Sequence, residues 1–357
     1  MKRTKLFAML LAAAMLLTLC ACGNTDAPAQ DNTADTTEPA PAPVEPAPAP
    51  VEPTPAEPAL DTELPVNIMT LNGTTGFGMA KLIADKTAGT AALNYNISVE
   101  TDASNVTAAL INGTVDIAAL PTNAASVVYN KTQGAVQVLA LNTRGVLYVV
   151  ADSSETITSL ADLEGKTVYA PAQNPTFIAQ YLFQANGVDV TVDNTYAQPA
   201  DLNTAVAAGE VSIAVLPEPM VTVARSKNPD LVVALDLTEE WDKVAPAGSL
   251  VQGCVVARTA FVQENPAAVA AFLEEYGASI EGLTTDIEGT AAKIEALGIF
   301  TKAAVAAKAI PNCNVCFITG EPMRAALNEF LTIMHGVAPQ SVGGAVPADD
   351  FYCVFNG

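Results

Sequence analysis

From residue 65 onward, the chain alternates short apolar runs rich in β-branched residues with longer segments of helical periodicity. Apolar runs bounded by Gly, Pro or Asn predict strands, and the periodic segments between them predict helices. We expect strands at 65–71, 96–101, 115–120, 136–142, 146–151, 167–170, 190–196, 211–216 and 254–257. We expect helices at 79–87, 103–112, 124–132, 176–186, 199–208, up to 225, 265–281, 285–297, 302–309 and 321–334. This alternation indicates an α/β fold with mostly parallel strands.

Two segments of the chain, 109–125 and 205–221, share one pattern. Each runs through a helix, a Gly, an apolar strand, Leu-Pro and a second helix: ALINGTVDIAALPTNAA in the first and AVAAGEVSIAVLPEPMV in the second. Two similar lobes with the same βα arrangement would explain the match. Coincidence between short apolar patterns is the alternative.

The N-terminus has the pattern of an export signal, and we expect it to act as one. Basic residues within the first five positions precede an apolar run from Leu6 to Leu19, which is too short to span a bilayer as a stable helix. The run ends in Leu19-Cys20-Ala21-Cys22, which is similar to a bacterial lipobox. The similarity implies a signal peptide at 1–21, cleavage before Cys22 and lipidation of Cys22. A cleaved signal with an unmodified Cys22 is the alternative.

Residues 22–62 form a tract of Ala, Pro, Glu, Asp and Thr without an apolar period. Such a tract buries too little surface to order, and its repeated Pro favours an extended spacer of on the order of 100 Å. A stalk with a function of its own is the alternative. Loss of the three basic residues of the signal takes the formal charge from −22 to −25, and the domain without the eight acids of the tract carries −17. An acidic domain argues against nucleic acid and against a polybasic membrane patch.

Residues that commonly carry chemistry are scarce in the domain. The single His, His335, follows an amphipathic segment and is expected at a helix end, which argues against a His-based triad or a multi-His metal site. The four cysteines Cys254, Cys313, Cys316 and Cys353 favour a structural disulfide or buried free thiols over redox or metal chemistry, because no second CxxC accompanies 313–316. We expect no catalytic residue, no metal and no cofactor.

A set of positions in the domain resembles a known family. They are Leu110, Asn112, Gly113, Val115, Asp116, Ile117 and Ala118; Leu160, Leu163, Gly165 and Lys166; 208–211 leading into 216–219; and Phe261, Pro266, Val269, Phe272 and Leu273. Their order resembles the extracytoplasmic solute-binding proteins of ABC importers, in the branch that binds nitrate, sulfonates, taurine and thiamine precursors.

This resemblance implies a fold and a division of the chain. The fold is the two-lobed, periplasmic-binding-protein-like type II fold, with mixed sheets flanked by helices and two crossover strands near 141–149 and 248–257. Lobe 1 would hold 63–145 plus 251–357, and lobe 2 would hold 146–250. The lobes would close on a ligand as a hinged clamp.

The candidate ligand site lies at the carboxyl ends of the strands. There, helix N-termini offer unpaired N–H groups to a ligand. The candidate residues are Asn72, Gly73, Thr74, Thr75, Gly76, Phe77, Thr122, Asn123, Asn174, Thr176 and Glu218. Helix capping is the alternative for each, and for Glu218 it is a first-turn acid without a ligand role.

The composition of these loops bears on the solute. They contain no Lys or Arg, which disfavours a strongly anionic solute. We expect a neutral or zwitterionic ring compound that stacks on Phe77 or Tyr148. The loop at 73–78 lacks the Gly-Lys-Ser/Thr end of a nucleotide loop, so phosphate hydrolysis is not indicated.

The resemblance also implies a function. The protein would capture a small organic solute between its lobes and deliver it to an ABC permease and its ATPase. It would act as a monomer at the extracytoplasmic face of the cell membrane, held through the lipid on Cys22. Two alternatives stay open: a ligand-binding sensor lipoprotein, and a thiamine-pyrimidine-synthase-like enzyme, which needs a His- and Cys-rich catalytic set that we do not find.

Overall fold

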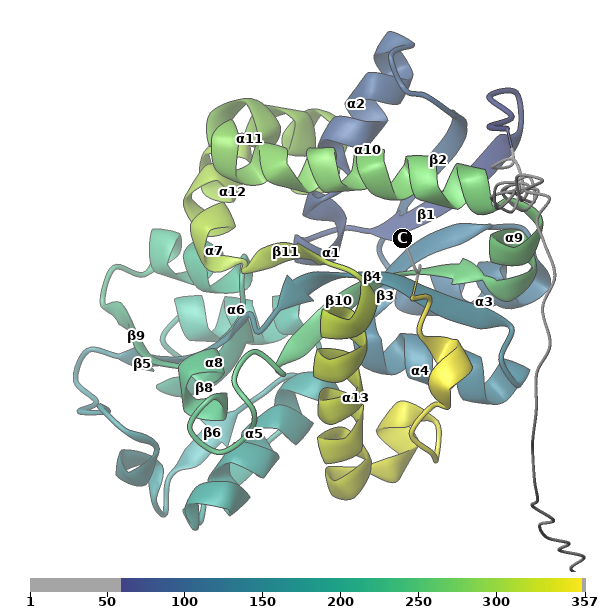
Figure 1. Ribbon diagram of the computed structural model, residues 1–357. Coiled ribbons are helices and arrows are strands. Elements are labelled where there is room, and N and C mark those ends of the chain that lie inside the picture. The colour runs from purple at the N-terminus through teal and green to yellow at the C-terminus, as the bar shows by residue number, and fades with distance from the viewer. Residues whose placement is uncertain (1–58, 355–357) are drawn as a thin grey trace, which may run out of the picture. The chain divides into compact units, whose positions relative to one another are not determined.

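The computed structural model describes residues 59–354 (Figure 1). These described residues all belong to one compact unit. The predictions for the signal peptide, for Cys22 and for most of the spacer lie outside the described residues.

The first of two sheets has six strands in the spatial order β11-β4-β10-β3-β1-β2. They are β1 (Pro65–Leu71), β2 (Asn94–Glu100), β3 (Ile117–Pro121), β4 (Val136–Arg144), β10 (Val251–Arg258) and β11 (Val315–Ile318). β1 pairs in parallel with β2 and β3, whereas β10 runs antiparallel to β3 and β4, and β11 antiparallel to β4.

The second sheet has five strands in the order β7-β6-β8-β5-β9. They are β5 (Leu147–Asp152), β6 (Thr167–Tyr169), β7 (Thr191–Asp193), β8 (Ile213–Pro217) and β9 (Leu231–Asp236). β6 pairs in parallel with β7 and β8, and β5 runs antiparallel to β8 and β9.

Helices flank both sheets (Figure 1). They are α1 (Thr74–Phe77), α2 (Ala80–Ala88), α3 (Ala103–Asn112), α4 (Thr122–Thr132), α5 (Asn174–Asn186), α6 (Pro199–Ala207), α7 (Met220–Lys227), α8 (Leu237–Trp241), α9 (Thr259–Glu264), α10 (Pro266–Thr285), α11 (Ile287–Ala296), α12 (Ala303–Ala309) and α13 (Gly320–Val337). Short 3-10 turns lie at Leu160–Leu163, Ile310–Asn312, Pro339–Val342 and Asp349–Phe351.

The predicted mixed sheets are present, but the expectation of mostly parallel strands is wrong. Antiparallel pairings make up five of the nine between the described strands. Four of the five involve β5 or β10, the two strands that enter one sheet directly from the other, and the fifth pairs β11 with β4. A strand that arrives from the opposite sheet starts at the edge where the parallel strands end, so it must run against them.

The two matched segments occupy equivalent places. Segment 109–125 forms the end of α3, then β3 and the start of α4, and 205–221 forms the end of α6, then β8 and the start of α7. β3 lies between β10 and β1, and β8 lies between β5 and β6, so each segment supplies the strand between the entering strand and the parallel pair. The repeat is therefore a feature of the fold.

Two apolar cores lie on opposite faces of the first sheet. The α10-side core contains Val66, Phe77, Phe272, Tyr276 and Cys353, among others. The α13-side core contains Val138, Leu141, Phe330 and Tyr352, and it continues into the second sheet through Val149, Phe183 and Trp241. Trp241 is fully buried between Tyr181 of α5 and Phe330 of α13, with ring centroids 4.8 Å and 5.9 Å away.

Candidate functional site

Loops from the two sheets meet through two direct hydrogen bonds. The Thr74 hydroxyl, after β1, donates to the backbone carbonyl of Glu218, after β8, at 2.9 Å. The Asn174 amide, after β6, donates to Oδ1 of Asn123, after β3, at 2.9 Å. The structure therefore brings one predicted residue from each of the four loops into contact across the sheets, in two pairs.

The loop after β1 depends on two glycines. Gly73 has φ 76° and ψ −159°, a region that side chains disfavour, and its N–H donates to Ile299 O at 2.9 Å. A Cβ on Gly76 would lie only 1.9 Å from Leu71 O. These glycines let the chain turn sharply into α1, a single helical turn within what the sequence predicted as a loop, and so they place Thr74.

Phe77 and Tyr148 do not offer the free ring faces that we expected. The Phe77 side chain is 0% exposed and lies in the α10-side core, edge-on to Phe300 with centroids 6.1 Å apart. Tyr148 is 8% exposed, its hydroxyl donates to Asn312 O at 2.8 Å, and burial raises its pKa well above the usual range. Both rings are already packed, which corrects the expectation of a stacking face.

Two of the predicted threonines hold their own surroundings. The buried Thr122 hydroxyl donates to Val251 O at 2.8 Å, so it joins the start of α4 to β10. The Thr176 hydroxyl donates to Pro171 O at 2.7 Å and accepts from the Asn194 amide at 2.6 Å. These bonds are structural, but neither is the helix cap that was the alternative for these residues. Asn72 is exposed and Thr75 half-buried, both on the loop after β1.

Asn174 lies at the contact between the sheets, and its side-chain oxygen has no hydrogen-bond donor among the described residues. The residue is 8% exposed at the first turn of α5, and Oδ1 has no hydrogen-bond partner among the described residues. A buried acceptor without a donor is costly, typically about 1–3 kcal/mol. Asn174 Oδ1 can therefore accept a hydrogen bond from a donor group of a solute that binds beside it.

Glu218 has two separate roles. Its carboxylate is 4% exposed and accepts from Thr222, from the hydroxyl at 2.9 Å and from the backbone N–H at 3.1 Å. Burial raises its pKa, while the Thr222 bonds and the charge of Arg225 act in the opposite direction. The carboxylate thus supports the start of α7 from a position before its first turn, and it is the backbone carbonyl that reaches Thr74.

The loop before β11 was absent from the predicted site, yet it is hydrogen-bonded to the chain segment that crosses from β4 to β5. Asn314 has the left-handed φ of 45°, which Asn tolerates better than most residues. The Arg144 N–H donates to Asn314 O at 3.0 Å, and the Asn314 amide donates to Gly145 O at 2.6 Å. The sequence signal for this loop was an Asn between two predicted elements. Such an Asn indicates a turn but does not show which residues it contacts.

The four cysteines of the domain are free thiols rather than a disulfide; three are buried and Cys316 is half-buried. Burial raises the pKa of Cys313 to about 12 and of Cys316 and Cys353 to about 11, and it raises that of Cys254 further. Thiols with raised pKa are poor nucleophiles. Within residues 59–354, no three His, Cys, Asp or Glu side chains gather closely enough to hold a metal ion.

Two mixed sheets whose loops meet at the carboxyl ends of their strands define a two-lobed binding-protein fold. The family model described as "ABC transporter, phosphonate, periplasmic substrate-binding protein" matches residues 85–297, which is more than half of the chain. The chain belongs to this family of ABC-transporter substrate-binding proteins. Curated protein sequences gave no match.

Solved structures share the fold. An ABC transporter structure from Parabacteroides distasonis is 22% identical, with 82% of this chain and 99% of that chain covered and a TM-score of 0.70. The periplasmic aliphatic sulphonate binding protein SsuA from Escherichia coli is 13% identical, with 82% and 94% covered and a TM-score of 0.65. The alkanesulfonate-binding protein SsuA from Xanthomonas axonopodis pv. citri, bound to MOPS, is 12% identical, with 82% and 96% covered and a TM-score of 0.59.

The family fixes the broad role. The chain is a substrate-binding protein of ABC import, which implies an extracytoplasmic location, a small solute and an ABC permease as partners. None of the described helices has the length and apolar character needed to cross a membrane.

Proposed function

We propose that this protein binds a small polar solute rich in N–H donors between the four loops that carry Thr74, Asn123, Asn174 and Glu218. The observation that carries the proposal is the pair of hydrogen bonds between the sheets, Thr74 to Glu218 and Asn174 to Asn123. When the lobes separate, these groups lose their partners. A solute that offers matching groups replaces those bonds and stabilises the closed form.

The polar groups at the contact favour donors on the solute. Glu218 supplies a buried backbone carbonyl, and Asn174 Oδ1 is an acceptor without a partner among the described residues. The nearby Glu218 carboxylate adds negative potential when ionised, which repels an anion. An amine- or amide-bearing neutral or zwitterionic solute therefore fits better than a bare phosphonate or sulfonate, although relatives are named for those anions.

The N-terminal features complete the proposal. A lipid on Cys22 would hold the mature chain at the extracytoplasmic face of the cell membrane, and the Pro-rich tract 22–62 would let the domain reach an ABC permease. A monomer suffices for this role, since the four loops come from one chain. Metabolic labelling with a fatty acid, compared between wild type and Cys22→Ala, tests the anchor.

A thermal-shift screen tests the solute class, because bound solute raises the melting temperature by mass action. The panel holds an alkyl phosphonate, an alkyl sulfonate, zwitterionic amino compounds and neutral heterocycles with N–H groups. We expect stabilisation by the last two classes. Stabilisation by the phosphonate or sulfonate alone would contradict the proposed solute class.

A matched pair of variants tests the site. Asn174→Leu removes the amide at the contact, whereas Asn186→Leu changes the same residue type at the far end of α5, where the amide donates to Leu182 O at 2.8 Å. We expect the first to weaken binding of a confirmed solute about tenfold, the equivalent of about 1.4 kcal/mol, and the second to leave binding unchanged. Equal affinities of the two variants would place the site elsewhere.

A further inference from the structure

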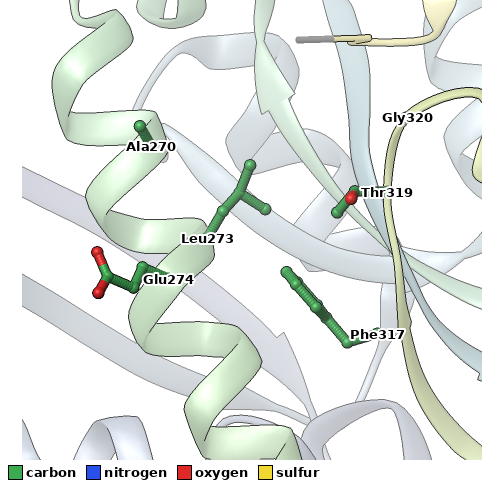
Figure 2. Close-up of a pocket in the computed structure, with 6 residues that line it drawn as sticks. All are labelled: Ala270, Leu273, Glu274, Phe317, Thr319 and Gly320. Atoms are coloured by element: carbon green, nitrogen blue, oxygen red, sulfur yellow. The ribbon is translucent and has the colours of Figure 1, made fainter. Parts of the chain in front are cut away.

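A groove lies between α10 and the end of β11 (Figure 2), away from the four loops. It encloses about 320 Å³ and is lined by Ala270, Leu273, Glu274, Phe317, Thr319 and Gly320. In Figure 2, Leu273 and the Phe317 ring point toward one another, and the Glu274 carboxylate points away. Phe317 is 37% exposed, although its ring packs on α10 so closely that a Cβ on Gly277 would lie 3.0 Å from it. The groove is thus an apolar surface that is only partly covered.

The described chain ends on the same edge of the first sheet. Tyr352 forms a parallel bridge with Val138 of β4. β10 occupies one edge of β4, so Tyr352 lies on the other edge, where Ile318 of β11 pairs with Leu141. A chain that runs parallel to β4 from Val138 advances toward Leu141. A continuation of the described chain in this direction would reach the end of β11, where the groove begins.

The side chains before this end alternate between the two cores. Tyr352 lies in the α13-side core, Cys353 in the α10-side core, and Val354 packs against the α13-side core. Successive side chains of an extended chain point to opposite faces, so the next one, Phe355, belongs on the α10 side. The groove is on that side, because Leu273 packs against the α10-side core. Three residues beyond Val354 reach up to about 10 Å.

We propose that the groove is the docking site for Phe355 of this same chain, the residue after the last described one, with its ring between Leu273 and Phe317. The groove has the volume of roughly ten water molecules at about 30 Å³ each, which is room for one aromatic side chain. Aromatic pairs stabilise each other beyond their buried area. The docked tail completes the packing of β11, the short edge strand that follows the Asn314 loop at the crossover.

A double-mutant cycle in the full chain tests this contact. Phe355→Ser is expected to lower the melting temperature by about 2–4 °C, whereas the control Asn356→Ser leaves it unchanged. Phe317→Ser also lowers it, and the double variant loses less than the sum of the two, because residues in contact are not additive. The proposal is overturned if Phe355→Ser matches the control, or if the two losses add.

A second measurement, fluorescence quenching, tests the proposal even if the destabilised variants fail to fold. The chain has one tryptophan, Trp241, which is fully buried, so an indole introduced by Phe355→Trp is the only one open to acrylamide unless the groove shields it. We expect weak quenching of this indole, and several-fold stronger quenching when Ala270→Arg blocks the groove. Strong quenching in both proteins means that the tail lies elsewhere and leaves the groove to another occupant, which refutes the proposal.

Discussion

The segments 109–125 and 205–221 form the same strand, loop and helix in the two sheets. The residues that follow Leu-Pro in each segment, here called its tip, contact the opposite sheet with different groups. The tip after β3 presents the half-buried side-chain amide of Asn123. The tip after β8 presents the buried backbone carbonyl of Glu218, to which Thr74 donates. The repeated scaffold therefore fixes where the tips meet, and the residues after Leu-Pro decide how polar, how buried and how titratable each contact is.

The largest expected loss of stability comes from a substitution that moves the backbone of the loop carrying Thr74. Gly76→Ala places a Cβ 1.9 Å from Leu71 O, so the turn that positions Thr74 must move. We expect a loss of about 4 kcal/mol or more in the free energy of unfolding, measured by urea denaturation.

Gly336→Ala is the matched control for this change. It adds the same methyl group within α13, where nothing lies within 4 Å. Ala is preferred over Gly in a helix, so the control should gain up to about 1 kcal/mol. Equal effects of the two variants would mean that the loop after β1 tolerates rearrangement.

The next effect isolates the buried hydrogen bond. Thr74→Val keeps the shape of the side chain but leaves the Glu218 carbonyl without its donor, at an expected cost of about 1–3 kcal/mol in unfolding free energy. The control Thr204→Val removes a hydroxyl that donates to Ala200 O within α6, a carbonyl that the helix itself already satisfies. A loss no greater than that of the control would show that the contact between the tips is not stabilising.

A pH series separates the tips, because only the one after β8 titrates. Burial raises the pKa of Glu218 above its ordinary value of 4.5, so the folded protein holds this proton more tightly than the unfolded chain. The carboxyl thus contributes stability below pH 4.5, and this contribution is lost as the pH rises through the raised pKa.

Glu218→Gln removes this titration. The stability of the variant relative to wild type should therefore increase between pH 4 and pH 7, on top of a constant offset from the altered bonds to Thr222. Urea unfolding across this range measures the difference. Parallel curves for the two proteins would contradict a raised pKa at Glu218.

The smallest expected loss of stability comes from a change at the half-buried tip after β3. Asn123→Ala removes the acceptor of the Asn174 amide, but water can reach this side of the contact, so we expect a loss of only about 0.5 kcal/mol. A loss as large as that of Thr74→Val, in the same denaturation experiment, would remove the distinction between a buried and a half-buried contact.

Prediction from sequence worked best where one periodicity covers a whole element. β1 was predicted at 65–71 and α3 at 103–112, and both have these bounds. β9 and α8 were missed, because Asp236 caps α8 directly after a strand that lies at the edge of its sheet and carries exposed Val232 and Val233.

The site was predictable as a set of loops but not as a set of contacts. The rule that ligands bind at carboxyl ends of strands selected the loops of Thr74, Asn123, Asn174 and Glu218, and these meet in two pairs, Thr74 with Glu218 and Asn174 with Asn123. It could not show that Phe77 is packed into a core, since an aromatic residue after a Gly-rich turn has the same local sequence in either case.

The sequence by itself determined most of the order of elements, the repeat of the two tips and the family, because these depend on local periodicity and on motifs near one another in the chain. Only the tertiary structure decided the antiparallel entry of β5 and β10, the free state of the thiols and the partners of Thr74 and Asn314. Those features join residues far apart in sequence, such as Thr74 and Glu218, and which buried groups pair depends on the packing of the whole domain.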